Sequence, residues 1–351
     1  MSDFSHYGGP SEEWLAVEAD LPSLPTGLSI SERKSVTNKL REELSAKAMK
    51  SIGDQLRIRD WTLPTRDGAT IVARSYRARA TGEEPLPVYL YFHGGGFLFG
   101  TLASEDATCA RTALSNNVVV LSVNYRHTPE FVYPTAWDDA EDAFIWLHAN
   151  IKEIGGKADK VIVGGPSAGG QLAASLTLAQ HLGKFAKDLP PIAGQILLIP
   201  CLAHVDCYEP QSKKLKDPSK SSLIENENAP LLPKTMIDLF TGLLKITNPD
   251  VNDLRLNPGN ATPDQVKGLP PSVFGICGLD PFRDEALLYA KMLAEAGVPT
   301  DVHIFKGVPH GFRRFGDKLS ESQHWDDTID GGITWALTKP AATGEFVIRE
   351  L

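Results

Sequence analysis

One serine of this chain lies in a pentapeptide that could make it a nucleophile. The segment Gly165-Pro-Ser-Ala-Gly169 fits G-x-S-x-G, follows an apolar run at 161–163 and precedes a helical stretch from Gly169. A sharp strand-to-helix turn of this kind strains the serine backbone and exposes its hydroxyl. A glycine-rich turn of a nucleotide-binding fold is the alternative, but the region has neither G-x-G-x-x-G nor Gly-Lys-Ser/Thr. The pattern predicts a nucleophile at Ser167.

A second glycine-rich segment could stabilise negative charge. His93-Gly-Gly-Gly-Phe97 follows an apolar run at 88–92. Consecutive glycines let backbone N–H groups point at one position, as the oxyanion of a tetrahedral intermediate requires. Alone, three glycines would indicate a flexible loop. Together with the serine pentapeptide, they predict an oxyanion hole formed by the N–H groups of Gly95, Gly96 and Ala168.

The chain also offers a base and an acid. A serine hydroxyl is a weak nucleophile unless a base takes its proton and a carboxylate orients that base, in the chain order Ser, acid, His. Of the histidines after Ser167, His310 is favoured because it lies in a loop just beyond an apolar run. Asp280 is the favoured acid because it follows another such run. Its rival Asp284 opens a helix, where a carboxylate also interacts favourably with the helix dipole.

Aromatic side chains near these motifs could line an apolar pocket for the acyl or alcohol group. Ordinary core packing is an equal alternative for each of them. The five candidates are Phe97, Phe99, Tyr133, Phe240 and Phe282. No His, Cys or Asp spacing suggests a metal site, and we expect neither a metal nor an organic cofactor.

The elements that must carry these residues follow an alternating pattern. Nearly continuous apolar runs, typical of strands buried on both faces, lie at 88–92, 118–123, 161–163, 195–199, 272–276 and 302–305. Helical stretches lie between them at 103–114, 136–150, 169–181 and 284–296. A hairpin of residues 56–63 and 70–76 precedes the first run. The alternation predicts an α/β fold with a mostly parallel, doubly wound sheet.

Two stretches fall outside the alternation. Residues 31–53 form a helical stretch in which Val36, Leu40 and Leu44 share one face, so we expect an amphipathic helix that needs a partner surface. Residues 200–271 hold a polar, proline-rich loop and a helical stretch at about 233–244. An excursion of this length indicates an inserted cap element.

Charge and cysteine content limit the partners and the compartment. A formal net charge of −9 and a pI near 5.5 argue against a nucleic-acid-binding surface. Four cysteines without C-x-x-C spacing are too sparse for a disulfide scaffold. The sequence has no signal-peptide-like segment and no apolar run of membrane-spanning length. We expect a cytoplasmic protein without a membrane span; its oligomeric state is open, and a homodimer is one option.

The motifs together resemble one family, the hormone-sensitive-lipase-like carboxylesterases, also called family IV esterases. The similar features are His93-Gly-Gly-Gly-Phe97, Tyr125-Arg126, Pro129-Glu130, Tyr133-Pro134, Ser167-Ala-Gly-Gly170, Asp280-Pro281 with Asp284, and His310-Gly-Phe312. The resemblance implies an eight-stranded α/β-hydrolase core with a helical cap. It also implies hydrolysis of carboxylic esters, here expected to be short- to medium-chain, without a cofactor.

The resemblance suggests a division of the chain and carries one departure. We expect an N-terminal cap segment at 1–55, a hydrolase core at 56–202, a cap insertion at 203–248 and the rest of the core at 249–351. The family usually has Asp where this chain has Pro166, which removes a carboxylate and a backbone donor beside the serine. Substrate preference is the property that this change puts in doubt.

Two other functions compete with ester hydrolysis. Some relatives use the same site for acyl transfer, elimination or cyclisation of natural-product intermediates, because water and another acceptor compete for one acyl-enzyme. Plant gibberellin receptors resemble the family as non-catalytic small-molecule receptors, but they have lost the catalytic histidine. The presence of His310 argues against that second option.

Overall fold

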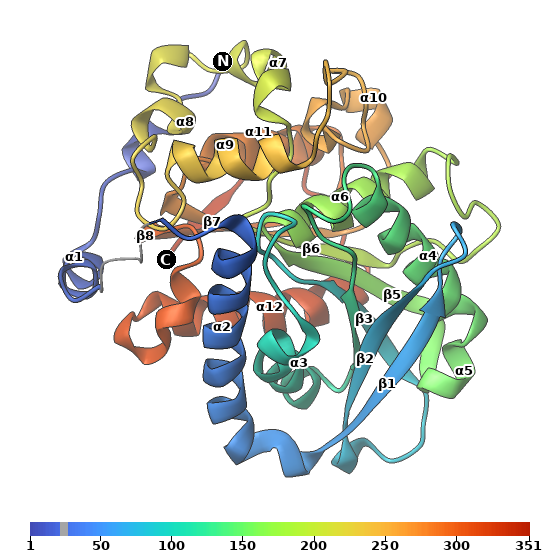
Figure 1. The fold of residues 1–351 in the computed structure, drawn as a ribbon. Coiled ribbons are helices and arrows are strands. Elements are labelled where there is room, and N and C mark those ends of the chain that lie inside the picture. The colour runs from blue at the N-terminus through green and yellow to red at the C-terminus, as the bar shows by residue number, and fades with distance from the viewer. Residues whose placement is uncertain (22–26) are drawn as a thin grey trace.

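A nine-stranded sheet runs through the molecule, and helices cover both of its faces (Figure 1). The computed structural model describes residues 1–21 and 27–351. The strands are β1 (Leu56–Pro64), β2 (Thr70–Ala78), β3 (Leu86–Phe92), β4 (Val119–Asn124), β5 (Gly156–Pro166), β6 (Gly194–Leu198), β7 (Ser272–Leu279), β8 (Thr300–Pro309) and β9 (Ile348–Glu350). Their order in the sheet is β1-β2-β4-β3-β5-β6-β7-β8-β9.

The pairing of the strands brings several of their carboxyl ends to one edge. β1 pairs antiparallel with β2, and β2 pairs antiparallel with β4, whereas all later neighbours pair in parallel. The predicted α/β-hydrolase fold class is therefore confirmed. The sheet has one strand more than the eight that the family resemblance implies, because three C-terminal residues add β9 to the outer edge of β8.

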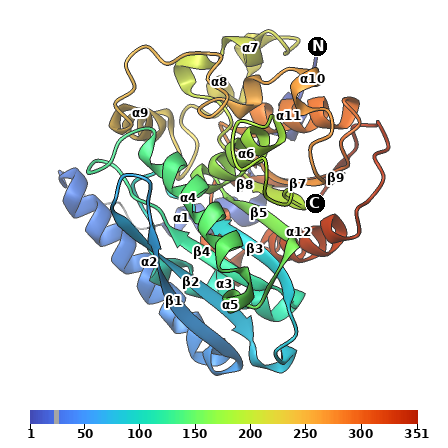
Figure 2. The same cartoon turned by 90° about the vertical axis from the view of Figure 1, so that its right-hand side faces the viewer.

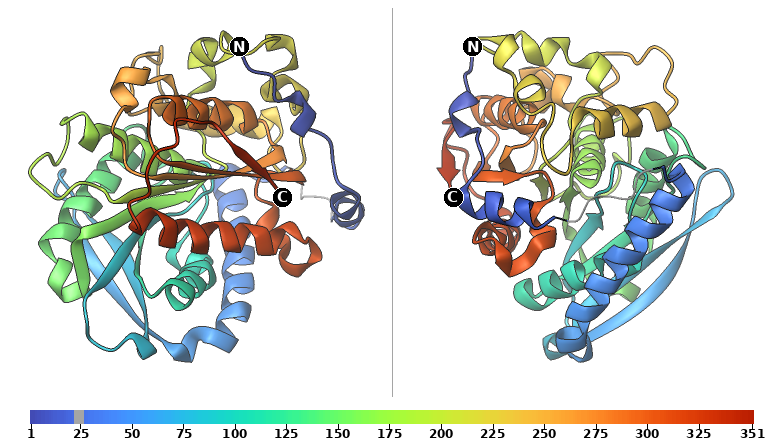
Figure 3. Two further views of the ribbon diagram at one scale, coloured as in Figure 1. Left: turned by 180° about the vertical axis from the view of Figure 1, so that it is seen from behind. Right: turned by 60° about the vertical axis from the view of Figure 1, so that its left-hand side comes forward.

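Helices form one layer on each face of the sheet. The α-helices are α1 (Glu12–Ala19), α2 (Ile30–Ile52), α3 (Leu102–Asn116), α4 (Thr135–Ala149), α5 (Ile151–Ile154), α6 (Ala168–His181), α7 (Glu209–Ser212), α8 (Ser222–Glu225), α9 (Lys234–Leu243), α10 (Pro263–Val266), α11 (Arg283–Glu295) and α12 (Glu321–Leu337). Helices α3 and α12 pack on one face, and α4, α6 and α11 on the other. Figure 3 shows the sheet between α11 and α12. Among the described residues, no helix is long and apolar enough to cross a membrane.

The central strands are buried on both faces, as their apolar runs predict. Every residue of β6 is buried, and so are the last five residues of β3. Val, Ile and Leu dominate these strands, and β-branched side chains suit the pleated surface of a sheet covered by helices. This packing gives the loops at the carboxyl ends a rigid base.

The N-terminal residues lie along the carboxyl side of the sheet rather than apart from it. Trp14 of α1 is fully buried, and its ring centroid lies 5.6 Å from that of Phe315. The Ser11 N–H donates a hydrogen bond to the carbonyl of Gly307 in β8 at 2.9 Å. Ser2 forms a parallel bridge with Leu215, so the start of the chain contacts the segment between β6 and β7. Residues 22–26, within the predicted cap segment 1–55, lie outside the described residues.

Helix α2 departs from the expectation of a buried apolar face. Its start is well defined, because Ser29 and Glu32 form a capping box. Val36, Leu40 and Leu44 are nevertheless 50%, 56% and 51% exposed. Figure 2 shows α2 on the outside of the molecule.

The polar face of α2 makes the contact with the rest of the protein instead. The surface it meets is the polar N-terminal part of α3 and the two residues before it, which offer backbone N–H groups and a carboxylate. The contacts are Asn38 Oδ1 with the Gly100 N–H at 2.8 Å, Arg41 with Glu105 at 2.7 Å, and Ser45 Oγ with the Ala107 N–H at 3.0 Å. Polar contacts therefore hold the middle of α2, while Ile30, Met49 and Ile52 pack against apolar clusters near its two ends.

Candidate active site

Ser167 occupies the turn between β5 and α6. Its backbone has φ 55° and ψ −119°, an unfavourable conformation for a residue with a side chain. Its N–H donates to the Leu198 carbonyl at 2.8 Å, and its carbonyl accepts from the Gln171 N–H at 3.0 Å. Strand β6 and the first turn of α6 thus fix the strained residue, which is the geometry expected of a nucleophile elbow.

The small residues on either side of Ser167 are required by close backbone approach. A Cβ atom on Gly165 would lie 1.8 Å from the Phe92 carbonyl oxygen, and one on Gly169 would lie 1.9 Å from the same atom. The turn therefore packs directly against the end of β3. This contact explains why glycine stands at both ends of the pentapeptide.

The structure brings Ser167, His310 and Asp280 into one hydrogen-bonded chain. His310 Nε2 lies 2.9 Å from Ser167 Oγ, and His310 Nδ1 lies 2.8 Å from Asp280 Oδ2. An ionised carboxylate can only accept, so Nδ1 carries the proton and Nε2 is free to accept from the serine hydroxyl. The other oxygen of Asp280 accepts from the Phe282 N–H at 2.9 Å. Asp280 follows β7 and His310 follows β8, at the same edge of the sheet as Ser167.

The alternative acid, Asp284, points elsewhere. Its carboxylate pairs with the fully buried Arg283 at 2.9 Å and accepts from the Ser222 N–H at 2.8 Å. Burial raises the pKa of Asp284, and the adjacent Arg283 opposes that shift. Arg283 also pairs with Glu225 at 2.8 Å. Asp284 therefore belongs to an ion-pair network that joins α8 to α11, while Asp280 lies against the histidine.

The glycine-rich segment after β3 turns its backbone toward Ser167. Gly95 has φ 134° and Gly96 has φ 61°, a region that favours glycine. Among the described residues, the N–H groups of Gly95 and Gly96 have no acceptor. The Ala168 N–H is the first of α6 and has no partner within its helix. Three donors therefore remain available beside the serine.

Neighbouring loops hold this segment in place. The Tyr125 hydroxyl donates to the His93 carbonyl at 2.7 Å, and the Thr128 N–H donates to the Phe97 carbonyl at 2.8 Å. Both contacts come from the chain that follows β4. They fix the two ends of the glycine run and leave its central N–H groups unengaged.

Charged residues of the same loop form ion pairs. Arg126 pairs with the buried Asp139 at 2.6 Å and with Asp67 at 2.6 Å. Glu130 pairs with Lys34 of α2 at 2.6 Å. The loop after β4 is therefore tied both to the core and to the outer helix.

Comparison with known proteins agrees with this geometry. Residues 89–314 match a protein family described as alpha/beta hydrolase fold. Esterase LipI of Mycobacterium tuberculosis is 33% identical over 298 residues, which cover 83% of this chain and 85% of that protein. The chain belongs to the α/β-hydrolase family. The predicted resemblance to hormone-sensitive-lipase-like carboxylesterases is confirmed, as is the prediction of an enzyme of the carboxylic ester hydrolase class.

Two solved structures extend the likeness over nearly the whole chain. A structure described as Bacterial Heroin Esterase has a TM-score of 0.79 at 28% identity and covers 93% of this chain and 98% of that chain. A structure described as Vibralactone Cyclase has a TM-score of 0.84 at 26% identity and covers 97% of both chains. Proteins that share this fold are thus described both as an esterase and as a cyclase.

The proline that departs from the family pattern packs against the glycine-rich segment. A Cβ atom on Gly94 would lie 2.8 Å from the Pro166 carbonyl oxygen and 3.3 Å from its ring. Pro166 ends β5 immediately before the strained serine. Its side chain therefore fills space between the elbow and the segment that carries Gly95 and Gly96.

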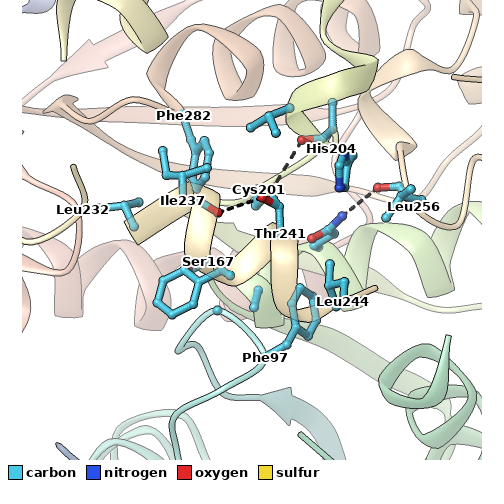
Figure 4. A pocket seen from close by; sticks show the side chains of 16 residues that line it. Phe97, Ser167, Cys201, His204, Leu232, Ile237, Thr241, Leu244, Leu256 and Phe282 are labelled. Carbon is cyan, nitrogen blue, oxygen red and sulfur yellow. Dashed lines mark hydrogen bonds between the residues drawn. The ribbon is translucent and has the colours of Figure 1, made fainter. Parts of the chain in front are cut away.

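An apolar pocket of about 520 Å³, its open mouth included, extends from Ser167 beneath α9. Large apolar side chains make up most of its wall, and Figure 4 shows several of them around the serine. They include Phe97, Leu232, Ile237, Phe240, Leu244, Leu256 and Phe282. The ring of Phe240 lies over the glycine segment, because a Cβ atom on Gly96 would meet it at 2.4 Å.

Three of the five aromatic residues proposed for this pocket line it, and two do not. Phe99 packs its ring edge-to-face with Phe240 at 5.8 Å, in a small cluster outside the pocket wall. The ring centroids of Tyr133 and Trp137 lie 4.8 Å apart, and the Tyr133 hydroxyl donates a hydrogen bond to the Asp253 carboxylate. These contacts satisfy both side chains away from the substrate space.

Two polar residues that line the pocket are not predicted from the sequence. His204 follows β6, and Gln171 lies one helical turn after Ser167 on α6; both line the pocket. The spacing of Gln171 from the serine could have indicated it, since residues i and i+4 share a helix face. No local pattern distinguishes His204 from the other histidines. Among the described residues, no three His, Cys, Asp or Glu side chains converge in a way that could hold a metal ion.

Proposed function

We propose that this protein is a serine carboxylesterase that hydrolyses short- to medium-chain esters through an acyl-enzyme on Ser167. The observation that carries the proposal is the continuous hydrogen-bonded chain from Ser167 through His310 to Asp280. A non-catalytic receptor would not need a histidine aligned between a serine hydroxyl and a buried carboxylate. The relatives described as esterases support the same reaction class.

The first half-reaction follows from the positions of the protons. His310 Nε2 takes the hydroxyl proton of Ser167 as Oγ attacks the ester carbonyl, and Asp280 stabilises the resulting imidazolium. The carbonyl oxygen becomes an oxyanion within reach of the N–H groups of Gly95, Gly96 and Ala168. Preorganised donors of this kind typically contribute about a hundredfold or more each to the rate. The alcohol then leaves with the proton that His310 had taken.

The second half-reaction repeats these steps with water. His310 removes a proton from the water molecule that attacks the acyl-enzyme, and it returns the proton to Ser167 as the carboxylic acid leaves. No redox step or external group is needed, because bonds to oxygen are only exchanged. The apolar pocket beside Ser167 would hold the carbon chain of the substrate.

A panel of 4-nitrophenyl esters with increasing acyl length tests the proposal. We expect turnover of short and medium acyl chains that falls about 10⁴-fold or more in Ser167→Ala. Ser175→Ala is a matched control, because Ser175 is a buried serine two turns further along the same helix. Ester hydrolysis that survives in Ser167→Ala, or an equal loss in Ser175→Ala, would contradict the proposal.

Acyl transfer or cyclisation is a second candidate function, favoured by the likeness to Vibralactone Cyclase over 97% of both chains. A hydroxyl group of the acyl chain would then replace water as the acceptor and yield a lactone. Product analysis of a hydroxy-acyl ester separates the two reactions. Free hydroxy acid supports hydrolysis, and an accumulating lactone supports cyclisation.

We also propose a cytoplasmic location. All four cysteines are unpaired, which suits a compartment that keeps thiols reduced.

A further inference from the structure

Most polar groups that line the apolar pocket are already bonded to the protein. The Thr241 hydroxyl donates to the Ile237 carbonyl at 3.0 Å, one turn earlier on α9. The Cys201 thiol lies 3.9 Å from the Ala203 carbonyl, and burial raises the pKa of this thiol well above its usual range. Neither group offers a strong hydrogen bond to a ligand. His204 and Gln171 differ from them.

His204 presents a hydrogen-bond donor to the pocket. The ring Nδ1 accepts from the Asp206 N–H at 3.2 Å, and the backbone N–H of His204 donates to Asn257 Oδ1 at 2.8 Å. Burial lowers the pKa of His204, although the Asp206 carboxylate, 3.8 Å from Nδ1, opposes that shift, and in the neutral ring an Nδ1 that accepts leaves the proton on Nε2. Within residues 1–21 and 27–351, Nε2 has no hydrogen-bond partner and is not among the fully enclosed polar atoms.

Gln171 presents a hydrogen-bond acceptor to the same pocket. Its Nε2 donates to the Leu256 carbonyl at 2.7 Å, which fixes the orientation of the amide. Its Oε1 therefore faces the other way, and in the described part of the chain it is neither bonded nor fully enclosed. The side chain as a whole is only 2% exposed, so it cannot turn toward bulk solvent to satisfy this oxygen.

The donor and the acceptor are held next to each other. The Gln171 amide donates to the Leu256 carbonyl, and the His204 backbone N–H donates to the side chain of the next residue, Asn257. Figure 4 shows His204 beside Leu256 on one side of the pocket, opposite Leu232 and Phe282. Gln171 lies one helical turn after Ser167, about 6 Å along the axis, and both Gln171 and His204 line the same pocket as Ser167.

We propose that His204 and Gln171 form a subsite for a hydroxyl group carried by the pocket-bound part of the ester. The hydroxyl oxygen would accept from His204 Nε2–H, and its hydrogen would donate to Gln171 Oε1. A carboxylate would meet the negative end of the Gln171 amide dipole, and a plain alkyl chain would leave both groups unpaired. The inference rests on the proposed function, because it specifies the substrate class of that same site.

Matched pairs of esters test which part of the substrate carries the hydroxyl. For the acyl part, ethyl 3-hydroxybutanoate is compared with ethyl 3-methylbutanoate, which replaces the hydroxyl by a methyl group. For the alcohol part, 2-hydroxyethyl butanoate is compared with propyl butanoate. We expect kcat/KM to be about tenfold higher for the hydroxylated member of one pair, which corresponds to roughly one well-made hydrogen-bonding interaction.

Substitutions of His204 and Gln171 assign the preference to these two side chains. His204→Asn keeps a side-chain acceptor near the Asp206 N–H but does not reach the position of Nε2. Gln171→Met removes the amide with little change in length. Either variant is expected to bring the hydroxyl-to-alkyl ratio of kcat/KM close to one. His181→Asn, at the exposed end of the same helix, should keep the wild-type ratio.

Binding to Ser167→Ala separates this inference from the proposed function. Ligand-observed NMR with the same ester pairs measures dissociation constants when no turnover is possible. Tighter binding of the hydroxylated member that disappears in Ser167→Ala with His204→Asn supports the subsite, whether or not the wild type hydrolyses these esters. Equal binding of both members of both pairs overturns the subsite, even if hydrolysis in the wild type supports the proposed function.

Discussion

The sheet edge beneath Ser167 and the elements that cover it are built in different ways. At the edge, most of the contacts are made by backbone atoms. Gly165 and Gly169 pack against the end of β3, and Ser167 is held in a strained backbone conformation. In the cover, which we define as α2 and α9, side chains make the contacts, as Phe240 and Arg41 show. The edge should therefore tolerate almost no substitution, whereas the cover should tolerate many.

A methyl group added to the glycine segment should have the largest effect. In Gly95→Ala, the new Cβ would lie 2.3 Å from the Phe99 carbonyl oxygen at a backbone φ of 134°, so the segment must move. We expect kcat to fall about a hundredfold or more through loss of an oxyanion donor. Gly242→Ala on α9 is the matched control, because its Cβ would meet no atom within 4 Å. The measurement is the steady-state kcat of both variants on one 4-nitrophenyl ester. An equal fall of kcat in Gly95→Ala and Gly242→Ala would contradict the proposed difference between edge and cover.

Burial of His93 should make stability depend on pH. Burial lowers the pKa of His93 from 6.5 to about 4, so the unfolded chain binds more protons than the folded protein between these values. The stabilisation is fully present above pH 6.5 and is lost as the pH falls toward 4. His93 alone should cost about 2 kcal/mol of unfolding free energy between pH 7.5 and pH 5.0.

Urea unfolding of wild type and His93→Gln at both pH values measures the contribution of His93 to the pH dependence of the unfolding free energy. Between pH 7.5 and pH 5.0, the unfolding free energy should fall by about 2 kcal/mol less in His93→Gln than in wild type. His181 is exposed, so His181→Gln should behave as wild type. Burial also lowers the pKa of the nearby His127, and the charge of His93 lowers it further, so His127 contributes a loss of the same sign. An identical loss in wild type and His93→Gln would show that His93 is not held neutral by the fold.

The two faces of α2 should differ in how much they contribute to the free energy of unfolding. Arg41→Met leaves the buried carboxylate of Glu105 without its cation, although Tyr91 still donates to it. We expect a loss of about 2 kcal/mol in unfolding free energy, as is typical for a hydrogen bond to a charged group. Leu40→Gln on the exposed face should change it by less than about 0.5 kcal/mol. Denaturant unfolding that reverses this order would contradict the docking of α2 by its polar face.

The sequence predicts the edge better than the cover for a physical reason. Gly165, Ser167 and Gly169 are imposed by backbone geometry, and such constraints leave fixed residue types at fixed spacings. Asp280 and His310 are found by the same logic, because each follows an apolar strand in the expected order. These local rules need no knowledge of distant contacts.

The cover follows rules that a single sequence does not reveal. Apolar spacing on α2 predicts burial of Val36, Leu40 and Leu44, but the helix meets a polar surface, and that surface decides its orientation. Outside the cover, His204 lines the pocket and Phe99 does not, because residues 200–271 fold back over the sheet in a way that no local pattern records. Strand β9 is only three residues long and depends on a free edge of β8, so it too has no local signal.

Covalent labelling tests the role of Ser167 most directly. Diethyl 4-nitrophenyl phosphate forms a phosphorus–oxygen bond with an activated serine and releases 4-nitrophenolate, so it traps the nucleophile without a deacylation step. Peptide mass spectrometry should find one diethylphosphoryl group per chain, on Ser167, in proportion to the activity lost. Modification of a different residue in the inactivated protein, or full labelling of Ser167 with esterase activity intact, would contradict the proposed mechanism.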